Sequence, residues 1–171
     1  VYAEFLIPTR GVLGFRQPYL NATRGTGTFN TLFEGHEPMA GPIEIQQFGS
    51  LISHETGTTS AYALEHLQQR GTFFISPGEE VYAGQVVGQT IRPEDLVINV
   101  CRTKHMTGHR TTPKSIIDSL SPPRILSLDD AIGYLGNDEL IEVTPESRRG
   151  RKRELHHGLR YRADKNARKE S

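Results

Sequence analysis

A cysteine and two histidines stand at regular spacing in this 171-residue chain, as Cys101, His105 and His109. All three are common zinc ligands, and a spacing of four would place them on one face of a helix. Cys101 with a histidine could also form a thiol nucleophile and its base. The chain has no second cysteine and no third orienting residue with a local signature, and Thr107-Gly108 disfavours a helix. A small zinc-binding or thiol enzyme is therefore the alternative hypothesis, not the first.

The same residues lie in a polar segment, residues 101–124, that carries five basic side chains against one acid, Asp118. Its sequence, CRTKHMTGHRTTPKSIIDSLSPPR, has no helical or strand period along its length. A long segment of this kind between well-formed elements is typical of a functional loop, and its positive charge indicates a phosphate-bearing partner. We therefore predict a basic loop that contacts RNA. The predicted contacts are Arg102, Lys104, His105, Thr107, Arg110 and Lys114.

A second basic cluster lies near the C-terminal end of the chain. Residues 145–171 hold 10 basic and 4 acidic side chains, whereas the rest of the chain is mildly acidic. Such side chains bind phosphate through charge and counterion release, with little reading of base sequence. We predict that this cluster also contacts RNA, the alternative being a solvated run, and that residues 154–171 form a disordered basic tail. The cluster consists of Arg148, Arg149, Arg151, Lys152 and Arg153.

The elements that must position these segments form an α+β pattern. Residues 1–7 and 28–33 have the composition of strands on either side of a helical segment within 11–22, which is half of a ferredoxin-like split βαβ unit. A loose, proline-containing stretch then predicts a domain boundary near residue 46, which separates domains 1–46 and 47–171. The second domain is predicted to be β-rich with two helices, with strands at 48–53, 72–76, 80–82, 85–90, 96–100 and 139–143 and helices at 59–70 and 127–136.

Several function classes find no motif in the chain. It contains no G-x-x-x-x-G-K-[ST] phosphate loop, so we expect neither catalysis nor a bound cofactor. Paired carboxylates fall at turns and helix starts, where capping and the helix dipole explain them. A single cysteine favours a reducing, cytoplasmic compartment, and no apolar run approaches the roughly 20 residues of a membrane span, so no membrane partner is expected. The start at Val1, within a predicted strand, suggests a fragment.

Motifs along most of the chain together resemble the C-terminal part of the BipA/TypA family of translational GTPases. They are EFLIPTRGVLGFR, TRGTG, ETGTTSAYALEHLQQRG, PGEEVYAGQVVG, NVCRTKHMTGHR, PPRILSLDDAIGYLGNDELIEVTP and RKR, and they run from Val1 to about Arg153. The resemblance implies that residues 1–46 are the second half of an elongation-factor-G-like domain V and that residues 47–171 are the family's C-terminal domain. The GTPase domain, with its GTP and magnesium, would then belong to a missing part of the parent protein.

The resemblance also implies partners. The family binds the ribosome, and a loop of its C-terminal domain is reported to meet large-subunit ribosomal RNA and the acceptor end of the A-site tRNA. Lys104, Thr107 and Arg110 match the family's K-x-x-T-x-x-R pattern, whereas Gly108-His109 replaces the usual Asn-Met. The implied function is a non-catalytic, ribosome-binding fragment whose other partners are the N-terminal domains of its parent chain. A protein-interaction module with a solubilising tail is the third hypothesis.

Overall fold

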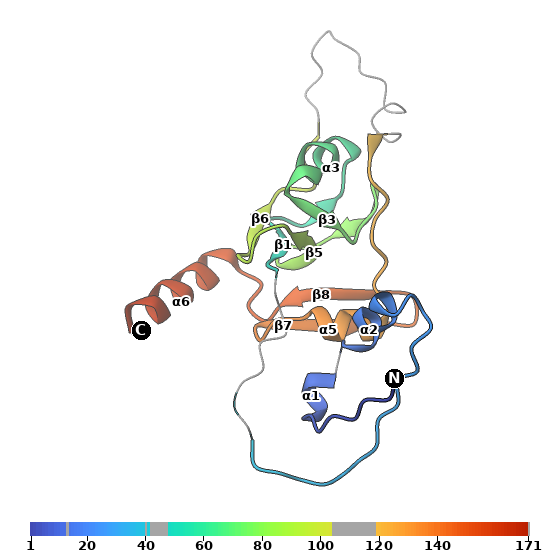
Figure 1. The fold of residues 1–171 in the computed structure, drawn as a ribbon. Helices are drawn as coiled ribbons and strands as arrows, with labels where there is room; N and C mark the ends of the chain where they lie inside the picture. Colours follow the sequence, from blue (N-terminus) through green and yellow to red (C-terminus); the bar gives the residue numbers. More distant parts are fainter. Residues whose placement is uncertain (13, 40, 42–47, 104–118, 171) are drawn as a thin grey trace.

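The computed structural model describes residues 1–12, 14–39, 41, 48–103 and 119–170, and it confirms a mixed α+β architecture (Figure 1). The helices are α1 (Thr9–Val12), α2 (Arg16–Ala22), α3 (Ala61–Leu67), the 3-10 turn η1 (Gln68–Arg70), α5 (Leu128–Tyr134) and α6 (His157–Glu170). The strands are β1 (Ser50–Ser53), β2 (Gly57–Thr58), β3 (Gly71–Phe73), β4 (Glu80–Val81), β5 (Gln85–Thr90), β6 (Leu96–Ile98), β7 (Glu139–Val143) and β8 (Arg148–Lys152).

Within the described residues one six-stranded sheet organises the fold. Its main path runs β6-β1-β5-β8-β7, and β3 pairs with β5 beside this path. β1 and β6 are parallel, and the other neighbours are antiparallel. β5 is the central strand because it pairs with β1, β3 and β8. β2 and β4 form a small second sheet.

One face of the large sheet carries the main hydrophobic core. Leu51 of β1 and Val87 of β5 are fully buried there, in one cluster with Leu64 of α3. The first turn of α3 is capped by Ser60, whose Oγ accepts a hydrogen bond from the Ala63 N–H at 3.0 Å. Fully burying a leucine or valine side chain such as those of Leu51 and Val87 stabilises the fold by about 1.5–3 kcal/mol. The cluster consists of Leu51, Leu64, Phe73, Ile75, Val81, Val87, Ile98 and Val100.

Helix α5 covers the opposite face of the sheet. Side chains alternate along a strand, so Ser50 points away from the Leu51 side, and its Oγ lies 2.9 Å from the Tyr134 hydroxyl of α5. The Tyr134 ring also meets the Phe74 ring edge-on, with centroids 5.3 Å apart. The predicted capping box at the start of α5 is confirmed, since Ser127 and Asp130 bond to each other's backbone N–H groups.

The N-terminal segment differs from the prediction. Neither residues 1–7 nor residues 28–33 form a strand, because among the described residues no neighbouring strand takes up their backbone N–H and C=O groups. α2 does form, and an aromatic cluster joins it to the following segment, with ring centroids 5.7–6.1 Å apart. The cluster consists of Phe15, Tyr19 and Phe29.

The C-terminal segment has more regular structure than we predicted. We expected residues 154–171 to be disordered, but α6 spans 14 residues of that range. The basic cluster before it forms β8, which pairs with β7 over five residues, from Glu139 opposite Lys152 to Val143 opposite Arg148. The chain therefore continues as sheet and helix, because strand pairing supplies backbone hydrogen bonds that the charged sequence does not suggest.

Candidate nucleic-acid interface

Helix α3 holds both ends of the predicted RNA-binding loop. At its start, the Ser60 Oγ donates a hydrogen bond to the Arg102 carbonyl. Beyond the undescribed residues 104–118, the Ser119 Oγ donates to the Glu65 carboxylate at 3.1 Å, and the Gln68 side chain donates to the Ser119 carbonyl at 3.4 Å. Ser60 and Gln68 are roughly 12 Å apart at the helical rise per residue. The basic segment therefore leaves and re-enters the body beside one short helix.

Of the six predicted RNA contacts in this loop, only Arg102 lies in the part of the chain that the structure describes. Arg102 is exposed, at the point where the described chain stops near α3. After the gap, Leu120 packs against the hydrophobic core and so anchors the returning chain. The other predicted contacts lie outside the described residues, namely Lys104, His105, Thr107, Arg110 and Lys114.

The second basic cluster lies on strand β8 and just after it. Arg148, Arg149 and Arg153 are exposed, and none of the three forms an ion pair within the described parts of the chain. Arg151 is different, because its Nε lies 2.7 Å from the Glu142 carboxylate across the β7–β8 pair. Three of the cluster's five side chains therefore remain available to a phosphate.

Lys152 is not on the surface that we predicted. Its side chain is 2% exposed, and its Nζ lies 2.5 Å from Asp95, 2.9 Å from Asp138 and 3.0 Å from Glu139. Strand alternation turns Lys152 inward while its neighbours Arg151 and Arg153 face the other way. A buried ammonium with three carboxylates around it does not reach an RNA phosphate, so Lys152 belongs to the interior and not to the interface.

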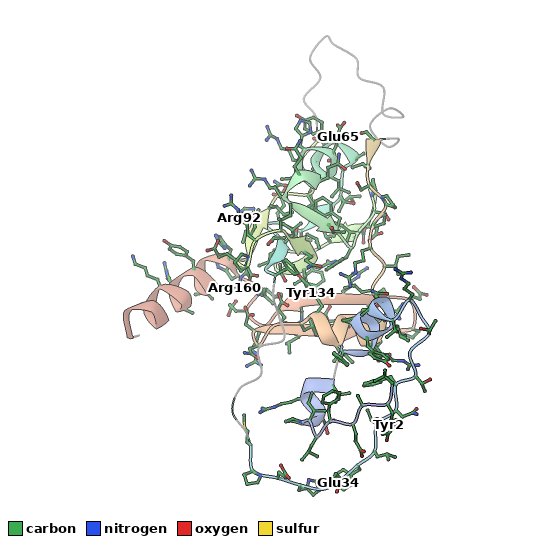
Figure 2. All side chains as sticks on the ribbon, viewed as in Figure 1. Tyr2, Glu34, Glu65, Arg92, Tyr134 and Arg160 are labelled. Carbon is green, nitrogen blue, oxygen red and sulfur yellow. The ribbon has the colours of Figure 1, made fainter. Side chains whose placement is uncertain are left out.

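This buried network links distant parts of the sheet. Burial alone would lower the pKa of Lys152, but Glu139 and the two aspartates outweigh it and raise that pKa above its ordinary value. Glu139 also accepts hydrogen bonds from the Ser50 Oγ at 2.5 Å and from the Gly136 N–H at 2.9 Å. Burial raises the pKa of the adjacent Tyr134 hydroxyl, which stays neutral. The network therefore fixes β8 against β1, β7 and the turn before β6. Tyr134, which is labelled in Figure 2, contacts this network through the Ser50 hydroxyl.

Cys101 has the properties of a packed, unreactive thiol. It is partly buried against the core, and burial followed by the charge of Glu55 raises its pKa, whereas a nucleophilic cysteine needs a lowered one. The described residues contain no group of three or more side chains that could hold a metal ion, and His105 and His109 lie outside them. The zinc or thiol-enzyme alternative therefore finds no support.

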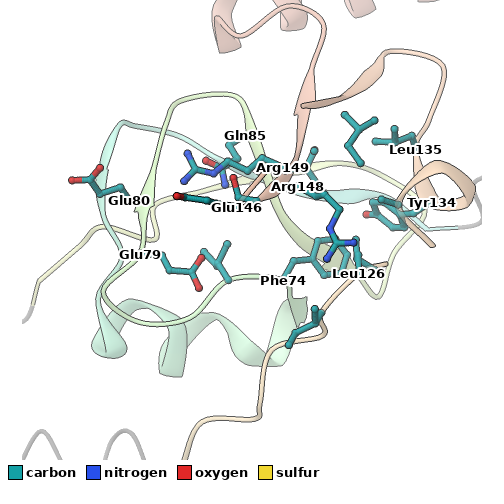
Figure 3. A pocket seen from close by; sticks show the side chains of 17 residues that line it. Phe74, Glu79, Glu80, Gln85, Leu126, Tyr134, Leu135, Glu146, Arg148 and Arg149 are labelled. Carbon is teal, nitrogen blue, oxygen red and sulfur yellow. The ribbon is translucent and has the colours of Figure 1, made fainter. Parts of the chain in front are cut away.

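A groove of about 440 Å³ lies between the β7–β8 hairpin, α5 and the segment that joins β3 to β4 (Figure 3). Phe74, Tyr134 and Leu126 contribute apolar surface to it. Two arginines and three glutamates share its rim, so the groove offers no net positive charge to a phosphate. These rim residues are Arg148, Arg149, Glu79, Glu80 and Glu146. Within the described residues, no helix is long and apolar enough to cross a membrane.

Comparison with known proteins decides the family. Residues 48–157 match the model of the TypA/BipA C-terminal domain. This chain belongs to the BipA/TypA family. The match begins just before β1 and ends at the first residue of α6, so it contains the sheet, α3 with both loop ends, and the Lys152 network.

Curated relatives extend the similarity over most of the chain. It is 43% identical to the large ribosomal subunit assembly factor BipA of Synechocystis over 87% of its length, and 40% identical to the Bacillus subtilis protein of that name over 94%. It is 45% identical to the putative elongation factor TypA-like SVR3, chloroplastic, of Arabidopsis thaliana over 85% of its length. The aligned parts cover 22–26% of these relatives, so the chain spans about a quarter of their length.

Sequence reasoning predicted the charged loop but did not identify the side chains that bind its two ends. The polar side chains that bind the loop ends belong to Glu65 of α3 and to its two capping residues, Ser60 and Gln68, and all three look like ordinary surface residues in the sequence. β8 was missed because RRGRK has no hydrophobic alternation. The one local signal was the Pro145-Glu146 turn after β7, which could have indicated a hairpin.

Proposed function

We propose that this chain is the ribosome-binding part of a BipA/TypA-type translational GTPase and that it performs no catalysis itself. The observation that carries the proposal is the attachment of both ends of the basic loop to α3 within a domain of this family. The names of the relatives, as large ribosomal subunit assembly factors, support the large subunit as the partner. GTP and magnesium would bind in another domain of the parent protein, which we place in the cytoplasm.

The mechanism is positioning. A folded body presents a cationic segment, and the segment contacts phosphates of large-subunit ribosomal RNA and the acceptor end of the A-site tRNA. Charge drives the association, so each phosphate contact steepens the dependence of log affinity on log salt by about 0.7–0.9. The loop contacts are Arg102, Lys104, His105, Thr107, Arg110 and Lys114, supported by the exposed residues of the second cluster, Arg148, Arg149 and Arg153.

The N-terminal segment suits a second partner, another domain of the parent protein. Phe5, Leu32 and Phe33 are 83%, 93% and 78% exposed, although side chains of this size are normally covered. Large apolar side chains that are this exposed in one short segment favour an interface. We propose that residues 1–46 complete a domain with another segment of the parent chain, and that this domain connects the ribosome-binding body to the GTPase.

The test compares two charge-matched double variants in cosedimentation with purified large ribosomal subunits. Lys104→Ala with Arg110→Ala removes two predicted contacts, whereas Arg16→Ala with Arg92→Ala removes two exposed arginines outside the predicted set. Two lost phosphate contacts correspond to about a 15- to 30-fold loss of affinity at 0.15 M salt and a salt slope smaller by about 1.4–1.8. The melting temperature of the Lys104→Ala with Arg110→Ala variant should equal that of the wild type, because none of the contacts in the described part of the chain involves these two side chains. Equal affinity of the two variants, or unfolding of the first, would contradict the proposal.

A further inference from the structure

Helix α6 is a well-anchored element. The Arg160 guanidinium donates hydrogen bonds to the carbonyls of Glu154 and Leu155, both at 2.7 Å, and so ties the first turn of the helix to the segment before it. That segment lies against the body, since a Cβ placed on Gly84 would come within 2.8 Å of the Leu155 Cα. The His157 ring also packs edge-on against the His54 ring, with the two ring centroids 6.4 Å apart. The start of α6 is therefore fixed relative to the sheet.

The rest of α6 extends away from the body. Figure 1 shows the helix projecting from the end of β8, with the C-terminus at its far end. Tyr161 is 62% exposed, and Arg162 and Lys165 are also exposed. At 1.5 Å per residue, the 14 residues of α6 form an arm about 21 Å long.

The charges of α6 are segregated by face. At about 100° per residue, Tyr161, Arg162 and Lys165 fall within one arc of about 100° on the helix. Among the side chains that the structure describes, α6 therefore has one exposed basic face, which consists of Arg162 and Lys165 beside Tyr161.

The composition of α6 selects the kind of partner. A helix that lies in a membrane surface, or in the groove of a partner protein, needs a continuous apolar face opposite its charges. Outside the basic face α6 offers Leu159 as its one large apolar side chain, followed by Ala163, Asn166 and Ala167. Attraction must therefore come from charge alone, which suits a regular polyanion.

We propose that the basic face of α6 binds the phosphate backbone of double-helical RNA. The side chains of a rigid helix at this spacing can follow a row of phosphates, and double-stranded RNA is recognised mainly through its shape and backbone. Binding is accordingly independent of base sequence. The inference rests on the proposed ribosome association and deepens it by naming a further contact, in a segment that lies almost wholly beyond the matched family domain.

The experiment measures the affinity of the full chain for a fluorescein-labelled, 20-base-pair RNA hairpin, by anisotropy across a salt series. Arg162→Gln with Lys165→Gln removes two charges from the basic face, and glutamine preserves helix propensity. The matched control, Ala163→Glu with Ala167→Glu, changes the net charge equally on the other face. We expect about a 30-fold loss at 0.15 M salt for the first variant, a salt slope smaller by about 1.8, and less than a 5-fold loss for the control.

Two further measurements test whether binding depends on charge and whether RNA is preferred to an anionic membrane. The exchange Arg162→Lys with Lys165→Arg keeps both charges and should retain affinity, so a loss there would overturn a charge-based contact. Vesicles with 30% phosphatidylserine should bind at least 10-fold more weakly than the hairpin, and equal binding would overturn the choice of RNA. Equal losses in the face variant and its control would also overturn the inference.

The outcomes separate this inference from the proposed function. If the α6 variant loses hairpin affinity while Lys104→Ala with Arg110→Ala leaves large-subunit binding unchanged, the inference stands and the proposed function fails. If the loop variant weakens large-subunit binding while the α6 variant binds the hairpin like the wild type, the inference alone fails.

Discussion

Replacing Lys152 with methionine should destabilise the protein strongly, because it leaves three carboxylates facing one another without a cation. The Nζ lies within 3.0 Å of Asp95, Asp138 and Glu139, and the side chain is almost fully buried. Methionine has a similar length and volume, so the cavity that it leaves is small. The cost is therefore electrostatic.

The magnitude follows from the exposure of each carboxylate. The side chains of Asp138 and Asp95 are 64% and 37% exposed, so both regain water when the lysine is lost, whereas that of Glu139 is 0% exposed. Removing one partner of a buried ion pair costs about 3–5 kcal/mol. Because only one of the three carboxylates is fully buried, we expect the lower end, about 3 kcal/mol, or a fall in melting temperature of roughly 6–12 °C.

The assay is urea unfolding followed by circular dichroism at pH 7. Lys152→Met with Glu139→Gln should recover much of the loss, because it removes both members of the buried pair. The folded-state pKa of Lys152 is raised, so its contribution is complete below its ordinary value of 10.5 and is lost as the pH rises above that value. A single variant within 1 kcal/mol of the wild type, or a double variant no more stable than the single one, would refute the reasoning.

Three further predictions test the fold that carries the interface. Leu64→Ala should lower the free energy of unfolding in urea by about 2–5 kcal/mol, because Leu64 is 2% exposed. The control Leu159→Ala, at a 49% exposed position, should lower it by less than about 0.5 kcal/mol, and similar losses for the two variants would contradict the assigned core. Ser127→Ala should cost about 1 kcal/mol by removing the capping box of α5, and a change below 0.3 kcal/mol would argue against that cap. Gly133→Ala should release the N-terminal segment and speed its limited proteolysis, since the new Cβ would lie 2.4 Å from the Gly14 Cα; unchanged cleavage would contradict this packing.

Much of the region that forms the large sheet, residues 48–152, could be predicted from local pattern. The expected strand at 85–90 coincides with β5, and the capping box of α5 forms at the predicted residues, because turns and caps are set by neighbours in the sequence. The strands expected at 1–7 and 28–33 failed because strand propensity needs a partner strand, which the described chain does not provide. Local propensity alone does not decide such segments.

The basic clusters show the same limit at the candidate site. Charge composition indicated both clusters, but it did not separate the different roles of their side chains. Lys152 is buried, Arg151 is paired with Glu142, and Arg149 is exposed. The carboxylates that surround Lys152 come from positions as distant as Asp95, so no local pattern predicts its burial. Likewise, the prediction of a disordered tail at 154–171 was wrong, because a charge-rich composition does not reveal that α6 forms there.

The central claim is that a folded body presents the basic loop to ribosomal RNA. The most direct test places a photo-crosslinking amino acid at Thr107 in the full chain bound to large ribosomal subunits, and maps the products by primer extension and mass spectrometry. We predict crosslinks to large-subunit ribosomal RNA that disappear in 1 M salt. Crosslinks confined to the protein's own body or to ribosomal proteins, with none to RNA, would contradict the account.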